Sequence, residues 1–349
     1  MQPVFRIYAG SKEITAAIRD RLIELVVTDE AGIQSDELKL TLDDRRREGG
    51  AIAELPKIGT VLTVSLGYAE TTLVAMGRFI VDEVEIRSPP ATLTVSAKAA
   101  DMVGPFRSPK TRSWDATTLG KIVEKIAGEH RYTPKLDPEL GRIAIAHLDQ
   151  TEESDMALLT RLAAKHDAVA KPVAGFLVLA KQGAIKTITG QVMPTINLRS
   201  SDLAEWRYRH SARKPGGRGS TSDGDTQKPP TTATGGTKAY WWDFEKGERR
   251  EVTTGQPPFE EIRYVHATEA EAKAAAATKK NCGERGQGEL SFSLPGDSRL
   301  AAEGRLSLFL RPGIPTDWRI KRVEHRLGTQ GYTTQVECER SAANPEAVT

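Results

Sequence analysis

Side chains capable of acid–base, thiol or metal chemistry are scattered through this 349-residue sequence and do not form groups. The six histidines form no His-Glu-x-x-His pattern, and the two cysteines, Cys282 and Cys338, form no zinc-binding pair. A Gly-x-Ser-x-Gly nucleophile turn and a Gly-x-x-x-x-Gly-Lys-Ser/Thr phosphate loop are also absent. The sequence therefore predicts no catalytic residue, no metal site and no cofactor.

One acidic pair, Glu152 and Glu153, could serve a glycosidase, which needs two carboxylates on opposite sides of the scissile bond. Adjacent residues point apart, however, and this pair directly precedes a helical pattern, SDMALLTRLAAK. Acidic side chains are stabilising near the positive end of a helix dipole. Helix stabilisation therefore explains the pair better than catalysis does.

The helix after this pair is predicted to begin at Ser154, whose hydroxyl can accept a hydrogen bond from an exposed amide of the first turn. Met156, Leu159 and Leu162 recur on one helical face, so we expect them to pack against a sheet. The helix is thus predicted to be a scaffold element and not part of an active site.

A second helix is predicted within SWDATTLGKIVEKIAGEHRYTP, with Thr117 or Asp115 as its N-cap. The segment FLVLA, from Phe176 to Ala180, has the apolar character of a strand. Together these elements predict that residues 104–190 form a small mixed α/β insertion.

Alternating apolar residues dominate the sequence on both sides of this insertion, and alternation is the period of half-buried strands. Several short strands at this spacing are typical of an antiparallel barrel or sandwich. The prediction is a mainly β protein with an α+β insertion, in which two related antiparallel β-barrel domains form a tube ring. The first barrel covers 1–103, and the second covers 191–210 and 238–341, interrupted by a helix that Thr268 and Glu271 cap.

Two further stretches lie outside the predicted barrels and the insertion. Residues 211–237 are rich in Gly, Ser, Thr and Pro and have too few apolar groups to offset the entropy of ordering, so a flexible loop is expected. Its basic residues Arg213, Lys214 and Arg218 suit either DNA or mere solubility. Residues 342–349 are expected to form a C-terminal tail.

The two predicted barrels share a short internal sequence repeat, which we call the echo. FIVDEVEI, starting at residue 79, aligns without a gap with WRIKRVEH, starting at residue 318. In both segments the first two inward-facing apolar residues are two positions apart, and the third follows after three positions instead of two. One extra residue at this place is the spacing that a β-bulge requires. The inward positions are Phe79, Val81 and Val84 in one segment and Trp318, Ile320 and Val323 in the other. The echo indicates a duplication, although short strand patterns also repeat by coincidence.

Charge and hydropathy limit the range of partners. Lys plus Arg (49) nearly balances Asp plus Glu (47) and the signs are interspersed, so no polyanion-binding or membrane-binding surface is indicated. No window approaches the roughly 18 apolar residues of a membrane helix, and the N-terminus is unlike a secretory leader. We therefore expect a protein that begins in the cytoplasm.

Three stretches, in order along the chain, resemble the late control protein D family, the baseplate hubs of contractile phage tails. They are TRSWDATTLGKIVEKIA, HLDQTEESDMALLTRLAAKHDAVAKP and DWRIKRVEHRLGTQGYTTQVECE. The segment TEESDMALLTRLA also looks like the equivalent helix of type VI secretion spike proteins. The resemblance implies a non-enzymatic homotrimer whose six barrels surround a channel and join the sixfold tail tube to the threefold central spike.

The resemblance also implies the partners and the location. The partners would be the central spike protein, the tail tube or tube-initiator protein, the tape-measure protein and other baseplate proteins, with DNA only as passing cargo. The particle would be a phage tail or an R-type-bacteriocin-like tail, assembled in the bacterial cytoplasm and released by lysis. The alternative is a tail-tip-associated cell-envelope hydrolase, which would need a catalytic constellation that the sequence does not show.

Overall fold

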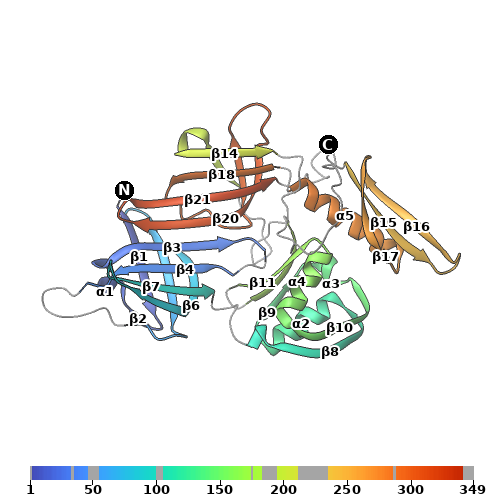
Figure 1. Cartoon of the computed structure of the whole chain (residues 1–349), viewed down its shortest axis with the longest axis horizontal. Helices are drawn as coiled ribbons and strands as arrows, with labels where there is room; N and C mark the ends of the chain where they lie inside the picture. Colours follow the sequence, from blue (N-terminus) through green and yellow to red (C-terminus); the bar gives the residue numbers. More distant parts are fainter. Residues whose placement is uncertain are drawn as a thin grey trace.

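A computed structural model describes residues 2–32, 35–45, 55–99, 105–173, 176–182, 195–210, 235–285 and 288–340. One sheet of 13 strands dominates the fold (Figure 1). Its main path runs in the order β14 (Glu205–His210), β18 (Gly288–Pro295), β21 (Gly331–Arg340), β20 (Asp317–Gly328), β3 (Leu22–Glu30), β4 (Glu37–Asp43), β7 (Thr92–Ala99), β6 (Val74–Arg87), β5 (Val61–Tyr68), β1 (Pro3–Ala9) and β2 (Lys12–Glu13). Two strands branch from this path: β19 (Arg305–Phe309) pairs with β20, and β13 (Ile196–Arg199) pairs with β19.

The sheet consists of two halves with the same strand order. The path is β3-β4-β7-β6-β5-β1 in the first half and β14-β18-β21-β20-β19-β13 in the second. The six strands of each half can be numbered 1 to 6 along the chain: β1, β3, β4, β5, β6, β7 in the first half and β13, β14, β18, β19, β20, β21 in the second. In these numbers both halves have the spatial order 2-3-6-5-4-1, so the same five strand pairings occur in each. One difference is that β13 runs parallel to β19, whereas β1 runs antiparallel to β5. Because both halves make the same five strand pairings, their topology indicates that one fold was duplicated.

A β-bulge interrupts β6 and β20 at matching positions. The register of β6 against β7 shifts directly after Val81, and the register of β20 against β21 shifts directly after Ile320. The residues left out of the two ladders are Asp82 and Lys321, which occupy the same position when the two segments are aligned. The extra residue restores the inward direction of the apolar side chain that follows it.

Each half has its own apolar core, built from the inward side chains of its strands. The first core contains Phe79 and Val81, with Val84 at its margin, and the second contains Trp318, Ile320 and Val323. The indole nitrogen of the fully buried Trp318 donates to the carbonyl oxygen of Pro315 at 3.0 Å, so its polar atom is satisfied.

Neither half closes into the predicted barrel. Among the described residues, no strand pair joins β3 to β1 or β14 to β13. The outer edge of β3 instead pairs with β20 of the other half, in a ladder that runs from Arg322 opposite Glu30 to Gly328 opposite Glu24. The edge of β3 that β20 occupies is not available to close the first half, and through this ladder the two halves share one continuous sheet.

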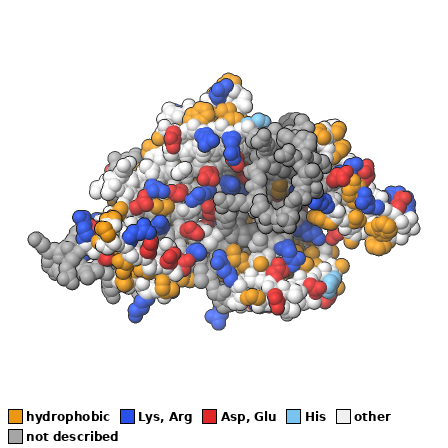
Figure 2. Space-filling view, in the orientation of Figure 1, with side chains coloured by type: hydrophobic (Ala, Val, Ile, Leu, Met, Phe, Trp, Pro, Cys, Tyr) orange, Lys and Arg blue, Asp and Glu red, His pale blue; other side chains and the backbone are white. Residues whose placement is uncertain are grey.

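Eight strands of the sheet, β14-β18-β21-β20-β3-β4-β7-β6, form a continuous antiparallel layer that we call the belt. Its inward face covers the two cores. Its outward face carries Lys and Arg side chains interspersed with Asp and Glu, and Figure 2 shows both signs across this face.

The insertion between the halves contains α2 (Leu119–Glu129), α3 (Pro138–Gly141) and α4 (Asp155–Lys165). One small sheet pairs β8 (Pro109–Thr118) with β10 (Ala144–Ser154), and another has the order β11 (Ala168–Val173), β12 (Phe176–Lys181), β9 (Thr133–Leu136). The N-cap of α2 is Thr118, whose hydroxyl oxygen accepts a first-turn amide, whereas the predicted caps Thr117 and Asp115 lie in β8. The short segments α1 (Thr15–Arg19), η2 (Pro105–Arg107) and η3 (Ser200–Asp202) lie outside these elements.

Ser154 is the N-cap of α4, and its hydroxyl oxygen accepts a backbone amide of the first turn at 3.2 Å. Leu159 and Leu162 are buried in the core of the insertion, whereas Met156 is only partly buried. Leu158, which the predicted stripe does not include, is fully buried. The buried stripe is wider than predicted because α4 contacts both β10 and β11, which belong to different sheets.

Residues 236–285 form a separate unit that the sequence did not predict. The sheet β16 (Glu248–Gly255), β15 (Gly236–Asp243), β17 (Phe259–His266) is covered by α5 (Glu269–Arg285), so this part of 238–341 does not belong to the large sheet. Small side chains at Ala272 and Ala276 let α5 lie close to β15, which explains the separate core. Residues 211–234 and 342–349, the greater part of the predicted loop and the predicted tail, lie outside the described residues. None of the described helices is long and apolar enough to cross a membrane.

Candidate functional site

The nine residues singled out from the sequence lie in three separate cores and form no common site. Phe79, Val81 and Val84 lie in the first half, Trp318, Ile320 and Val323 in the second half, and Met156, Leu159 and Leu162 in the insertion. They position strands and a helix and offer no surface for a ligand. Charged side chains gather at two other places, around Asp155 in the insertion and at the junction between the two halves.

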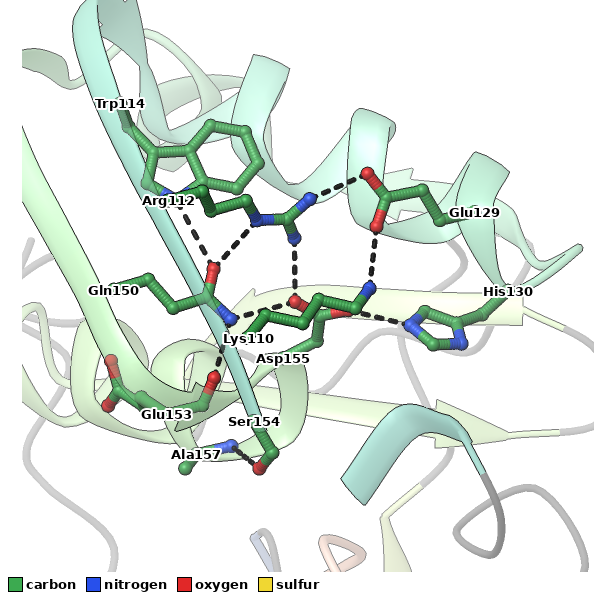
Figure 3. Close-up of polar contacts among 10 residues, drawn as sticks. All are labelled: Lys110, Arg112, Trp114, Glu129, His130, Gln150, Glu153, Ser154, Asp155 and Ala157. Atoms are coloured by element: carbon green, nitrogen blue, oxygen red, sulfur yellow. Dashed lines mark hydrogen bonds and ion pairs between the residues drawn. The ribbon is translucent and has the colours of Figure 1, made fainter. Parts of the chain in front are cut away.

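The Asp155 carboxylate is fully buried in the first turn of α4, with four nitrogen atoms within hydrogen-bond distance (Figure 3). These atoms are Arg112 Nη2 at 2.6 Å and Gln150 Nε2 at 2.9 Å from Oδ1, and Lys110 Nζ at 2.5 Å and His130 Nε2 at 2.7 Å from Oδ2. The partners come from β8, from β10 and from the C-terminal end of α2. A single carboxylate therefore ties three elements to the start of α4.

Glu129 completes this charged cluster. Its carboxylate accepts from Arg112 Nη1 at 2.6 Å and from Lys110 Nζ at 2.8 Å, so two cations face two anions. Burial alone would raise the pKa of the Asp155 carboxyl, but the hydrogen bonds that it accepts outweigh burial and hold this pKa below its usual value. The cluster is therefore charged and internally neutralised at neutral pH.

Three members of the cluster have the geometry of a possible metal site. Glu129, His130 and Asp155 each offer a ligand atom, and these atoms lie within 4.8 Å of one another. Both carboxylates, however, are already bound to Lys110 and Arg112. A divalent cation would lie beside an ammonium and a guanidinium group, and the repulsion opposes binding. The cluster fits a structural clamp better than a metal or acid–base centre.

His325 is the most buried histidine of the large sheet, in β20 at the ladder with β3. Its Nδ1 lies 2.9 Å from the Tyr332 hydroxyl, and its Nε2 lies 3.1 Å from the Leu300 carbonyl oxygen. Burial lowers the pKa of His325, so the ring is neutral at neutral pH. With both nitrogens engaged inside the protein, this ring packs the junction and is not placed to act on a substrate.

The β3–β4 turn is the place where the insertion and both halves meet. Lys171 of β11 donates to the Glu30 carbonyl oxygen at 2.9 Å and to the Asp36 carboxylate at 2.7 Å. Asp29 accepts the amide of Ala302 at 2.8 Å across the junction between the halves. Burial, together with the nearby Asp36 charge, raises the pKa of Asp29 to about 6. This turn therefore fixes the insertion and the second half to the first half.

Ion pairs flank the ladder between the two halves on the outward face of the belt. Arg326 lies 2.6 Å from Glu24, and Arg322 lies 3.1 Å from Glu30. In both pairs the cation belongs to β20 and the anion to β3. These ion pairs therefore favour the observed register of the β3–β20 ladder over registers shifted along the strands.

Sequence reasoning missed the partners in both charged places. Lys110 and Arg112 are separated from Asp155 by more than a helix and a strand, and no motif relates them. The available signal was weak: two basic residues alternate along a strand, and an acidic residue follows an N-cap. Lys171 carried no signal, because its partners come from another part of the fold.

A model of the family described as phage tail baseplate hub (GPD) matches residues 35–331 of this chain. The chain belongs to the phage tail baseplate hub family. The probable baseplate hub protein of Escherichia phage 186 is 31% identical over 380 residues, which cover 99% of this chain and 95% of that protein. The family named from the resemblance is therefore confirmed.

Solved structures have the same fold as this hub family member. The 43 kDa tail protein of prophage MuSo2 from Shewanella oneidensis has a TM-score of 0.69 at 15% identity, covering 98% of this chain and 99% of that one. An Escherichia coli component of the type VI secretion system, described as similar to the T4 bacteriophage tail proteins gp27 and gp5, has a TM-score of 0.53 at 11% identity, covering 94% of this chain and 77% of that one. The fold is thus shared beyond recognisable sequence identity.

Proposed function

We propose that this hub protein is a trimeric symmetry adapter, which joins a sixfold tail tube to a threefold central spike. Three chains would place six similar half-sheets around a channel. The proposal concerns the number and arrangement of subunits, because family membership alone fixes neither. Closed rotational symmetry is the usual solution for a homo-oligomer that must form a ring.

The observation that carries the proposal is the repeated strand order of the two halves. The five pairings of the first half recur in the second half, and the bulges at Asp82 and Lys321 coincide. A chain with two equivalent halves can present two equivalent docking surfaces. Three such chains present six, which matches a ring of six tube subunits.

A second observation supports the threefold side of the adapter. The insertion and the unit of residues 236–285 each occur once per chain, and Figure 1 shows both beyond the same end of the belt strands. Among the described residues, the opposite end of the belt carries only elements of the two halves (Figure 1). In a ring of three chains, the surface features of one rim would occur six times in nearly equivalent form, and those of the other rim would occur three times.

The proposed partners follow from this arrangement. The sixfold rim would bind the tail tube or a tube-initiator protein, and the threefold rim would bind the spike and other baseplate proteins. During assembly the channel would hold the end of the tape-measure protein, and DNA would only pass through it. The particle, a phage tail or a bacteriocin-like tail, would assemble in the bacterial cytoplasm.

Cryo-electron microscopy of intact particles, reconstructed without imposed symmetry, tests the adapter. We expect three copies of this chain between sixfold tube rings and a threefold spike, with the tube rings of the same reconstruction as the internal standard. Six copies, or a single copy, would refute the adapter while leaving the family assignment intact.

We also propose that the chain acts without catalysis, because the Asp155 cluster is saturated by its own partners. The purified chain should release no soluble fragments from peptidoglycan sacculi, with lysozyme as the positive control. Fragment release above the buffer blank would favour the tail-tip hydrolase instead.

A further inference from the structure

We propose that the contact between the insertion and the unit of residues 236–285 is a pH-sensitive latch. The latch holds the unit against the insertion at neutral pH and opens when His166 and His266 take up protons. Its two sides are the C-terminal end of α4, in the insertion, and the helix α5 with the end of β17, in the unit. The inference does not depend on the proposed ring, because both sides belong to one chain.

Polar side chains join the two sides of the latch. Lys165 Nζ of α4 lies 3.6 Å from Glu271 Oε1 of α5, and the Asn281 side-chain amide of α5 donates to the Asp167 carboxylate at 3.2 Å. Figure 1 shows α5 beside the insertion. Lys165 and Glu271 are both about half exposed, and an exposed ion pair adds little to stability. A contact held by such pairs is sensitive to any further charge that appears beside it.

A histidine lies on each side of this contact. His166 is the C-cap of α4, between Lys165 and Asp167 in the sequence, and His266 is the last residue of β17, where it is 6% exposed and packs on the Tyr264 ring. The Nε2 atom of each histidine is buried and has no hydrogen-bond partner within the described residues. A proton on such a nitrogen would have no acceptor, so the closed contact fits the neutral rings better than the charged ones.

The charged groups that act on both rings are Lys165 and Glu271, one from each side of the latch. Burial is the largest cause of a lowered pKa at both histidines. The Lys165 charge lowers the pKa of each ring further, and the Glu271 charge opposes this change. Asp167, the acidic neighbour of His166, accepts the Asn281 amide. Both rings are therefore neutral at neutral pH.

Protons favour the open state of the latch. When the unit leaves the insertion, water reaches both rings and their pKa values rise toward the ordinary 6.5. The open state then binds more protons than the closed state between the lowered values and 6.5. The contact is therefore at full strength well above pH 6.5 and weakens as the pH falls below it. Each histidine changes the ratio of open to closed chains by at most about tenfold per pH unit, and the two together by at most about 100-fold.

The connections of the two sides decide which part moves. Lys171 binds the insertion to the β3–β4 turn, so the insertion stays in place. The unit is joined to the belt through α5, which is followed by β18 after two residues. Opening therefore turns the unit away from the insertion without releasing it from the chain.

Fluorescence energy transfer within the full-length chain tests the latch. In a Cys282→Ser background, a donor and an acceptor would be attached at Lys121→Cys in α2 and at Lys246→Cys between β15 and β16, two exposed positions on opposite sides of the contact. Cys338 is buried and stays unlabelled. From pH 7.5 to pH 5, transfer efficiency should stay constant down to about pH 6.5 and then change reversibly, while far-ultraviolet circular dichroism stays constant.

Glutamine variants show which groups take up the protons. His166→Gln/His266→Gln removes both titrating rings and keeps polar side chains, so its transfer efficiency should not change with pH. His166→Gln alone is the milder change, because that ring is only partly buried, and its response should be about half as steep as that of wild type. The matched control is His147→Gln, which removes an exposed histidine of the insertion and should keep the wild-type response.

Three results would overturn the latch. The first is a wild-type transfer efficiency that stays constant from pH 7.5 to pH 5, and the second is a loss of circular dichroism over the range of the change, which would mean unfolding. The third is a response of full steepness in folded His166→Gln or in the double variant. Asp29, whose pKa is about 6, is the main rival. Asp29→Asn should keep the response, and its loss there would assign the movement to the junction between the halves.

Discussion

Asp29 is expected to destabilise the junction between the two halves at neutral pH, and Asp29→Asn should relieve this. The pKa of its carboxyl rises from 3.8 to about 6 on folding, because burial and the Asp36 charge disfavour the ionised form. A raised carboxyl pKa means that the folded state binds more protons than the unfolded state between these two values. The contribution of Asp29 to the free energy of unfolding is therefore fully present below about pH 4, and it is lost as the pH rises through about 6.

The size of the effect follows from the shift. About two pKa units at 1.36 kcal/mol each give an upper limit of about 3 kcal/mol. The Asp29 side chain retains 30% of its exposure, and solvent there screens the charge, so we expect about 1 kcal/mol. The asparagine oxygen can still accept the Ala302 amide, so the substitution removes the charge and keeps the hydrogen bond.

The assay is thermal unfolding of wild type and Asp29→Asn from pH 4 to pH 8. The variant should match wild type near pH 4 and gain stability up to about pH 6.5, after which the difference stays constant. Asp36→Asn is the matched control: it removes the carboxylate that Lys171 binds at 2.7 Å, and it also removes a charge that raises the pKa of Asp29, so the fall in stability between about pH 4 and pH 6 should become smaller than in wild type. A destabilised Asp29→Asn variant at pH 7, or a difference that does not change with pH, would refute the reasoning.

Two further substitutions address the insertion. Leu159→Asp places a carboxylate at a position that is 2% exposed, so we expect a loss of about 4 kcal/mol or more and few assembled particles. Ala164→Asp on the exposed side of the same helix should cost only about 1 kcal/mol, from helix propensity and the helix dipole. Normal particle yield from Leu159→Asp would contradict the packing described for α4. Asp155→Asn leaves Lys110 and Arg112 without a buried anion and should destabilise the insertion by about 3 kcal/mol in urea unfolding, while an unchanged midpoint would show that the cluster adds nothing.

Features that depend on local side-chain period could be read from the sequence. The bulges in β6 and β20 show as an extra residue between inward positions, and the cap at Ser154 shows as a hydroxyl before an apolar stripe. Both signals are contained in fewer than ten residues. Such signals fix the direction of side chains and the ends of elements.

Features that depend on the choice of strand partner could not be read in this way. The pairing of β3 with β20 joins residues about 300 positions apart, and an edge that accepts another half is locally the same as one that closes a barrel. For the same reason, the alternation in β15, β16 and β17 was assigned to the large sheet although these strands form their own. The Asp155 cluster depends on three elements that meet only in the folded chain.

One edge of β20 serves two ladders, with β19 of its own half before the bulge and with β3 of the other half after it, while the opposite edge stays paired with β21. The two halves are therefore linked by one unbroken strand as well as by side-chain contacts. A shearing load between β19 and β3 would pass along the backbone of β20 as tension, and the halves could part only if the ladder on one side of the bulge gave way. Mechanical strength of this kind depends on where one strand serves two ladders, and a protein that is only marginally stable to heat can possess it.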